Sequence, residues 1–174
     1  MIGKLAANVG VGLVAGLAGT TVMTAAQMAE MRLSKRPSSP TPAKAVEKVF
    51  SIRPVDEEAE NRLNWVVHFG YGTTWGACRG LLGAFGLRGP AATALHWASV
   101  QSTEYLVVPR LGLAPPVTKW GAKAVFMDMA FHVIYAISAG LVFDTLHRDV
   151  EKGLIRRDET TPPADPRVNA KRVA

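Results

Sequence analysis

Four long apolar stretches, separated by polar segments, dominate the pattern of hydrophobic and polar positions along this chain. The stretches cover residues 5–29, 63–85, 90–108 and 124–143. A helix that crosses the hydrocarbon core of a bilayer needs about 20 mostly apolar residues, and none of the four stretches alternates as a half-buried strand would. The sequence therefore predicts an all-α protein, a transmembrane bundle of four helices. The helices are expected near residues 5–30, 60–85, 90–109 and 120–146.

The first stretch has a second interpretation, because it follows Lys4 near the N-terminus, as the apolar region of a signal peptide does. Its length exceeds that of a typical signal peptide, and it takes part in the repeat described below. Both features favour a membrane span.

Polar segments divide the chain into a bundle region, residues 1–146, and a tail, residues 147–174. The loop at residues 31–62 contains "PAKAVEKVF", whose apolar side chains share one helical face, and this pattern predicts a short helix at the membrane interface. The acidic residues of "VDEEAENRLN" are typical of a helix start, so the second span is expected to begin there. The tail is charged and contains prolines, so we expect it to be largely disordered.

The second and fourth stretches share one spacing, a histidine followed by a tyrosine and then a glycine. It occurs as "HFGYGTTWG" from His68 and as "HVIYAISAG" from His132. Further matches in the same order pair Gln27 with Gln101, Glu30 with Glu104 and Asn64 with Asp128. This pattern predicts two tandem, parallel helical-hairpin repeats related by an axis along the membrane normal. Because the identities are few, coincidence is the alternative.

Small residues indicate that the histidines face the inside of the bundle. Gly72, Gly76 and Gly80 follow His68 at every fourth position, so they share its helix face, and such glycines let helix backbones approach closely in lipid. The matched polar residues also fall at similar membrane depths, which predicts a buried polar layer. Its expected members are Gln27, Glu30, His68, Tyr71, Gln101, Glu104, Asp128, His132 and Tyr135.

Three interpretations of this layer stay open, because ionisable groups in a bilayer are costly and are often functional. In the first interpretation the layer is purely structural and holds the helices together. In the second it forms a proton path or a small polar-ligand site, and in the third it binds a metal. Di-metal bundles use two Glu-x-x-His motifs, which this chain lacks, so no metal is expected. The candidate ligands, if a metal did bind, are Glu30, His68, Glu104, Asp128 and His132.

Composition narrows the function classes further. The net charge is +6 but no basic helix carries interleaved aromatic residues, so nucleic acid is not an expected partner. A single cysteine, Cys78, excludes an internal disulfide and a CxxC zinc framework. The expected partners are the lipid bilayer and a second copy or a larger membrane complex. The sequence assigns no catalytic residue and no cofactor, and Arg79 is expected to extend towards the lipid headgroups.

Three short motifs, "HFGYG", "PRLGLAPP" and "FHVIYA", lie within residues 64–140. In them the chain resembles the YagU-like family of small bacterial inner-membrane proteins. The resemblance implies a multi-pass inner-membrane protein without a known reaction, from a family with which acid-stress tolerance is associated. It puts His68, Pro115, Pro116 and His132 at family-like positions without an established role, while the loop at residues 31–62 departs from the family.

The expected function is therefore that of an accessory or stress-related membrane protein with a buried Glu/His layer. The alternative is a metal- or proton-handling component of a membrane redox or transport system.

Overall fold

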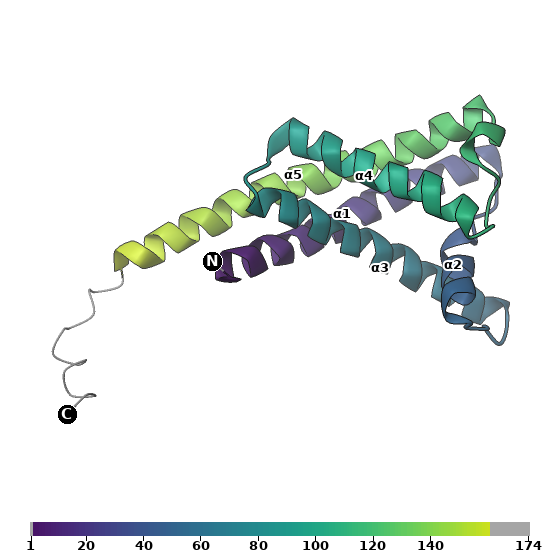
Figure 1. The fold of residues 1–174 in the computed structure, drawn as a ribbon, viewed down its shortest axis with the longest axis horizontal. Coiled ribbons are helices and arrows are strands. Elements are labelled where there is room, and N and C mark those ends of the chain that lie inside the picture. The colour runs from purple at the N-terminus through teal and green to yellow at the C-terminus, as the bar shows by residue number, and fades with distance from the viewer. Residues whose placement is uncertain (1, 161–174) are drawn as a thin grey trace.

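The structure, a computed structural model, describes residues 2–160, and the side chains as far as Arg148. This part of the chain is helical and contains no strand, so the all-α prediction is confirmed. The elements are α1 (Ile2–Ser34), α2 (Thr41–Phe50), α3 (Glu57–Ala84), α4 (Gly89–Arg110), the 3₁₀ turn η1 (Val117–Lys119) and α5 (Ala122–Thr160) (Figure 1). The four long helices lie where the four apolar stretches are, and α2 lies where the loop predicts a short helix.

Local signals explain where α3 begins and why α4 follows it so closely. The Asp56 side chain accepts a hydrogen bond from the Ala59 main-chain nitrogen at 2.7 Å, which caps the first turn of α3. After α3, Gly86 and Gly89 both adopt positive φ angles, which glycine allows without strain. This tight connection makes α3 and α4 antiparallel neighbours in the chain.

The long helices cross near the middle of the molecule and diverge towards the end that carries α2 (Figure 1). At the crossing, α1 and α3 are in backbone contact through glycines. A Cβ atom built on Gly16 would lie 2.7 Å from Gly76 Cα, and one built on Gly12 would lie 2.8 Å from the Gly80 nitrogen. Only glycine fits such a crossing, as the small-residue stripe of the sequence predicts.

The second pair of long helices packs with larger side chains. The buried core centres on α5, where Phe131, Tyr135 and Ala139 pack with Met23 of α1 and Val100 of α4. Four residues of this core, Met23, Val100, Phe131 and Tyr135, also line the cavity described below.

Among the described residues, two helices are long and apolar enough to cross a membrane. They are α1 and the Ala122–Arg148 part of α5, each with a mean hydropathy of 1.7. Less than half of each apolar window is buried inside the protein, 39% for α1 and 28% for α5. A core helix of a soluble protein would bury more of its apolar surface, so this exposed surface suits contact with lipid or with another protein.

Helix α5 is longer than the sequence pattern predicts. The sequence pattern predicts an end near residue 146, whereas the helix continues to Thr160. The physical reason is that residues 147–160 are rich in helix-forming Lys, Glu, Leu and Arg and contain no proline before Pro162. The remainder of the predicted tail, residues 161–174, lies outside the described residues.

Candidate functional site

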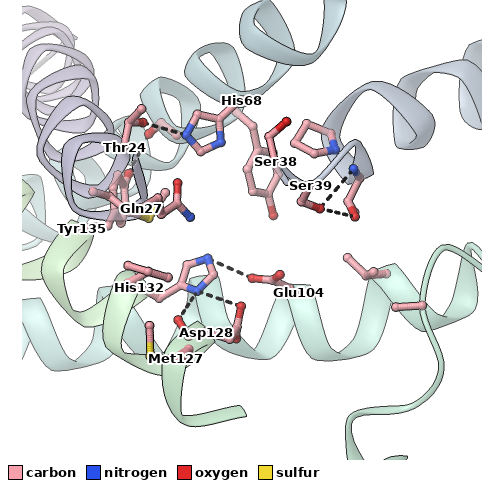
Figure 2. A pocket seen from close by; sticks show the side chains of 18 of the residues that line it. Thr24, Gln27, Ser38, Ser39, His68, Glu104, Met127, Asp128, His132 and Tyr135 are labelled. Carbon is pink, nitrogen blue, oxygen red and sulfur yellow. Dashed lines mark hydrogen bonds and ion pairs between the residues drawn. The ribbon is translucent and has the colours of Figure 1, made fainter. Parts of the chain in front are cut away.

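A cavity of about 1080 Å³ lies between the helices at the end where they diverge. It is lined by residues of α1, α2, α3, α4 and α5, and it reaches the polar connections at Ser38, Ser39 and Gly121. The charged and histidine side chains in its wall are Glu30, Arg36, His68, Glu104, Lys123, Asp128 and His132. Most of the polar residues that the sequence singles out therefore border one space, shown from close by in Figure 2.

His132 of α5 makes the densest set of polar contacts in this cavity. Its Nε2 atom lies 2.9 Å from Glu104 Oε2 of α4. Its Nδ1 atom lies 3.0 Å from the main-chain oxygen of Asp128 and 3.6 Å from Asp128 Oδ1, one helical turn earlier. Both ring nitrogens of His132 therefore face oxygen acceptors (Figure 2).

Gln101 completes the group by fixing the carboxylate of Asp128. Its Nε2 atom donates to Asp128 Oδ2 at 2.6 Å, and the glutamine side chain is buried. Gln101 and Glu104 lie three residues apart and so share one face of α4, while Asp128 and His132 lie four apart on α5. Two adjacent helix faces thus supply the whole cluster.

The hydrogen-bond pattern at His132 requires a proton in the Glu104 contact. A neutral imidazole has one N–H group and can satisfy only one acceptor, but His132 faces an acceptor at each nitrogen. Three arrangements place a proton in the contact: His132 is an imidazolium that donates to both acceptors, His132 is a neutral imidazole whose Nε2–H donates to the Glu104 carboxylate, or Glu104 is a carboxylic acid that donates to Nε2. In each arrangement one proton is held between Glu104 and His132.

His68, which matches His132 in the sequence spacing, has a different partner. Its Nε2 atom lies 2.9 Å from Thr24 Oγ1 of α1, and its ring packs edge-on against Trp65 and Phe69. Figure 2 shows His68 and Thr24 on one side of the cavity and the His132 cluster on the other, with Gln27 between them in this view. His68 therefore shares the cavity with His132 but not its carboxylates.

Glu30 does not join the His132 cluster, contrary to the predicted layer. It borders the cavity, but its Oε2 atom lies 2.8 Å from Arg36 Nη2. The physical reason is local, since Arg36 follows the end of α1 by two residues and can reach back to Glu30 without crossing the cavity. Glu30 thus borders the cavity while it pairs with Arg36.

The two tyrosines of the shared spacing also differ. Tyr135 is 2% exposed, and its hydroxyl donates to the main-chain oxygen of Gly72 at 2.6 Å. Tyr71 is 49% exposed, packs edge-on against Trp75 and lines the cavity.

Asn64, the counterpart of Asp128, holds α2 in place. Its Oδ1 atom accepts from the Ala43 nitrogen at 3.1 Å and its Nδ2 atom donates to the Ser39 oxygen at 3.2 Å. Two main-chain groups of the loop are thus fixed by one α3 side chain. The result is a wall of the cavity made from the polar segment that precedes α3.

The sequence interpretation missed a second buried charge pair at the opposite end of the bundle. Arg79 is fully buried rather than extended towards headgroups, and its Nη2 atom lies 2.6 Å from Asp144 Oδ1. Its guanidinium also stacks 4.3 Å from the centre of the Phe143 ring, and Asp144 Oδ2 accepts from the Gly89 nitrogen at 3.1 Å. The available signal was a base inside one apolar stretch, Arg79, and an acid directly after another, Asp144.

Of the five candidate metal ligands, three come together. Ligand atoms of Glu104, Asp128 and His132 all lie within 4.8 Å of one another, whereas Glu30 and His68 have other partners. The two carboxylates face different nitrogens of the same ring. A metal bound through one nitrogen would require a carboxylate to turn towards it, so the arrangement fits a held proton better than a metal ion.

The chain matches no protein family, no curated protein and no solved structure with which it was compared. What the cavity does is therefore argued from its own geometry.

Proposed function

We propose that this chain is a small multi-pass protein of a bacterial inner membrane in which all four long helices cross the bilayer. Large apolar side chains on the outward faces of α3 and α4 support the two spans that hydropathy leaves open, for example Val66, 70% exposed, and Leu106, 53% exposed. Helix α4, the shortest of the four with 22 residues, is ~33 Å long, enough for a hydrocarbon core of about 30 Å.

The cavity lining supports the proposal that the four spans are two tandem hairpin repeats. Four matched pairs border the same cavity, one member from each hairpin. They are Glu30 and Glu104, Asn64 and Asp128, His68 and His132, and Tyr71 and Tyr135. A two-fold relation between hairpins would bring equivalent residues to a common space in this way.

Within this bundle, the proposed function is proton handling by the Glu104–His132 pair. The observation that carries it is that both nitrogens of His132 face oxygen acceptors, so the pair holds a proton that the cavity connects to the polar end of the molecule. Histidine next to carboxylates inside a membrane is typical material for a proton relay or an acid-responsive switch. The resemblance to YagU-like proteins, with their association with acid-stress tolerance, agrees with an accessory, stress-related role.

Nuclear magnetic resonance of ¹⁵N-histidine-labelled protein in detergent or lipid tests this directly. The chain has four histidines, so single His→Gln variants assign the spectrum. We expect the His132 nitrogens to convert between imidazolium and neutral imidazole during a pH titration. In the Glu104→Gln variant, the pH at which His132 converts should change, because a neutral amide replaces the carboxyl group that shares the proton.

Matched controls separate the pair from general effects of substitution. Glu58→Gln removes an exposed carboxylate that pairs with Arg62, and His147→Gln removes a histidine elsewhere on α5. Both should leave the His132 titration as in the wild type. A His132 signal that stays neutral throughout, or one that is indifferent to Glu104→Gln, contradicts the proposal.

A second candidate function, binding of a divalent metal, is favoured by the convergence of three ligand-type side chains. Metal analysis of the purified chain distinguishes it. Near-stoichiometric metal that is lost in His132→Gln would support this candidate, and a metal-free chain whose His132 titrates would support proton handling.

A further inference from the structure

The size of the cavity exceeds what a proton or a metal ion requires. Its volume, about 1080 Å³, is that of a site for a small organic molecule, for which cavities of roughly 300–1,000 Å³ are usual. The His132 cluster occupies one part of its wall (Figure 2). Most of the remaining volume can therefore hold a ligand that has apolar groups as well as a charge.

The wall of the cavity is rich in aromatic rings. Its aromatic residues are Trp65, Tyr71, Trp75, Trp120, Phe131 and Tyr135. Aromatic faces bind apolar groups and attract organic cations through the ring quadrupole, whereas a strongly hydrated metal ion gains little from them. The lining thus favours an organic ligand with apolar groups.

The charge of the cavity lining determines the sign of the charge that the ligand should carry. Three carboxylates, on Glu30, Glu104 and Asp128, face two basic side chains, Arg36 and Lys123. One net negative charge is left when the histidines are neutral, and one proton on His132 neutralises it. A monovalent cation would neutralise it equally well, so the proton and the cation are alternatives on electrostatic grounds.

We propose that the cavity binds a monovalent organic cation with an apolar body, and that the bound cation replaces the proton held between Glu104 and His132. The exchange is balanced, because one positive charge enters and one proton leaves to water, and no covalent bond other than N–H or O–H changes. The proposal rests on the proposed proton-handling function and names the class of ligand to which it is coupled.

Isothermal titration calorimetry of the full chain in detergent, with tetraphenylphosphonium as the probe, tests the exchange. Titrations in two buffers of different ionisation enthalpy at one pH give the protons released per cation bound. We expect about one proton released per cation bound. In the pH range where the pair is protonated, the affinity should weaken by about tenfold for each unit by which the pH is lowered. Glu104→Gln and Asp128→Asn should each weaken binding by at least about tenfold, because each removes a carboxylate from the site.

Two controls identify the source of any binding. Glu58→Gln, which removes an exposed carboxylate outside the cavity, should bind the probe as the wild type does. Triphenylphosphine oxide, a neutral probe of similar shape, should bind much more weakly than the cation. Equal binding of both probes overturns the proposal and indicates a site for apolar chains such as those of lipids.

The remaining outcomes separate this inference from the proposed function. If the cation does not bind saturably while His132 still titrates, the ligand is wrong and proton handling stands. If the cation binds without releasing a proton, the exchange is wrong. If His132 does not titrate at all, the proposed function fails first, and the exchange fails with it whatever the cation does.

Discussion

The two helical hairpins of this protein carry the same spacing of polar residues but are held together by different forces. In the first hairpin, α1 and α3 touch backbone to backbone through glycines, and His68 bonds only the hydroxyl of Thr24. In the second, α4 and α5 meet through charged and amide side chains around His132. A shared sequence pattern has thus produced one tightly packed and one electrostatically bonded hairpin.

The comparison teaches that the distance between helices decides what a polar residue can do. Where glycines bring the backbones of α1 and α3 together, no long side chain fits between them. Where the helices stay further apart, side chains such as Glu104 and His132 meet across the gap. The four predictions below test this difference, beginning with the largest expected effect.

Asp144→Asn should destabilise the fold most, because it takes the carboxylate away from the buried guanidinium of Arg79, which links α3 to α5. Breaking a buried ion pair from one side costs about 3–5 kcal/mol, which thermal unfolding in detergent would report. The double variant Arg79→Met/Asp144→Leu should recover much of this loss. A single variant as stable as the wild type would contradict the account of this pair.

Gly76→Ala should destabilise more than Gly140→Ala, although the two glycines hold matching positions in the shared sequence spacing. A Cβ at Gly76 meets main-chain atoms of Gly12 and Gly16, which cannot move without separating the helices. A Cβ at Gly140 meets the side chain of Thr93, which can rotate away. We expect a cost of about 1–3 kcal/mol at Gly76 and less at Gly140, measured by thermal unfolding.

Gly70→Ala is the control for these substitutions, since no atom lies within 4 Å of the position of its Cβ. Because alanine favours a helix more than glycine does, this variant should be as stable as the wild type or slightly more so. Equal losses at Gly76 and Gly140 would remove the distinction between the two hairpins.

Glu104→Gln should destabilise the protein where Glu30→Gln does not. Glu104 makes a hydrogen bond to His132 in the cavity, and such charge-assisted bonds contribute about 1.5–3 kcal/mol. Glu30 pairs with the partly exposed Arg36, and exposed pairs contribute little. The melting temperature, measured over a series of pH values, should change in a step for the wild type and for Glu30→Gln. The Glu104→Gln variant should lack this step, because it lacks the carboxyl group that pairs with His132.

His68→Gln should have the smallest effect, because glutamine can keep a single hydrogen bond to Thr24. We expect a loss of at most about 1 kcal/mol, against a larger loss and an altered pH profile for His132→Gln. Unfolding of the two variants side by side checks this. Equal effects would mean that the histidines act as one unit, as a symmetric layer predicts.

The sequence indicated much of this architecture. Apolar stretches of span length predicted the four long helices, and an amphipathic pattern predicted α2. Glycines at every fourth position on α3 predicted its close approach to a neighbour. These features depend on residues near one another in the chain, so a single sequence contains the information needed to predict them.

The partners of the polar residues could be predicted only in part. Glu104, Asp128 and His132 were candidates from the sequence and are in contact, whereas Glu30 and Tyr71 border the same cavity with other partners. The Arg79–Asp144 pair was missed because each residue, taken alone, resembles a charge that extends to the membrane surface. The spacing of residues along a helix determines which face of the helix each one occupies. It does not determine which residue of a neighbouring helix lies opposite that face.

The sequence by itself determined the helices, their order and the set of ionisable side chains on their inner faces. Only the tertiary structure decided that α1 and α3 cross through glycines and diverge towards α2, which opens the cavity and places Glu104 against His132. The physical reason is that hydrogen-bonded helices form from local interactions, whereas their crossing points depend on how all side chains pack together. A polar side chain bonds whichever group that packing brings within reach, and here the packing places Glu104 against His132 and Thr24 against His68.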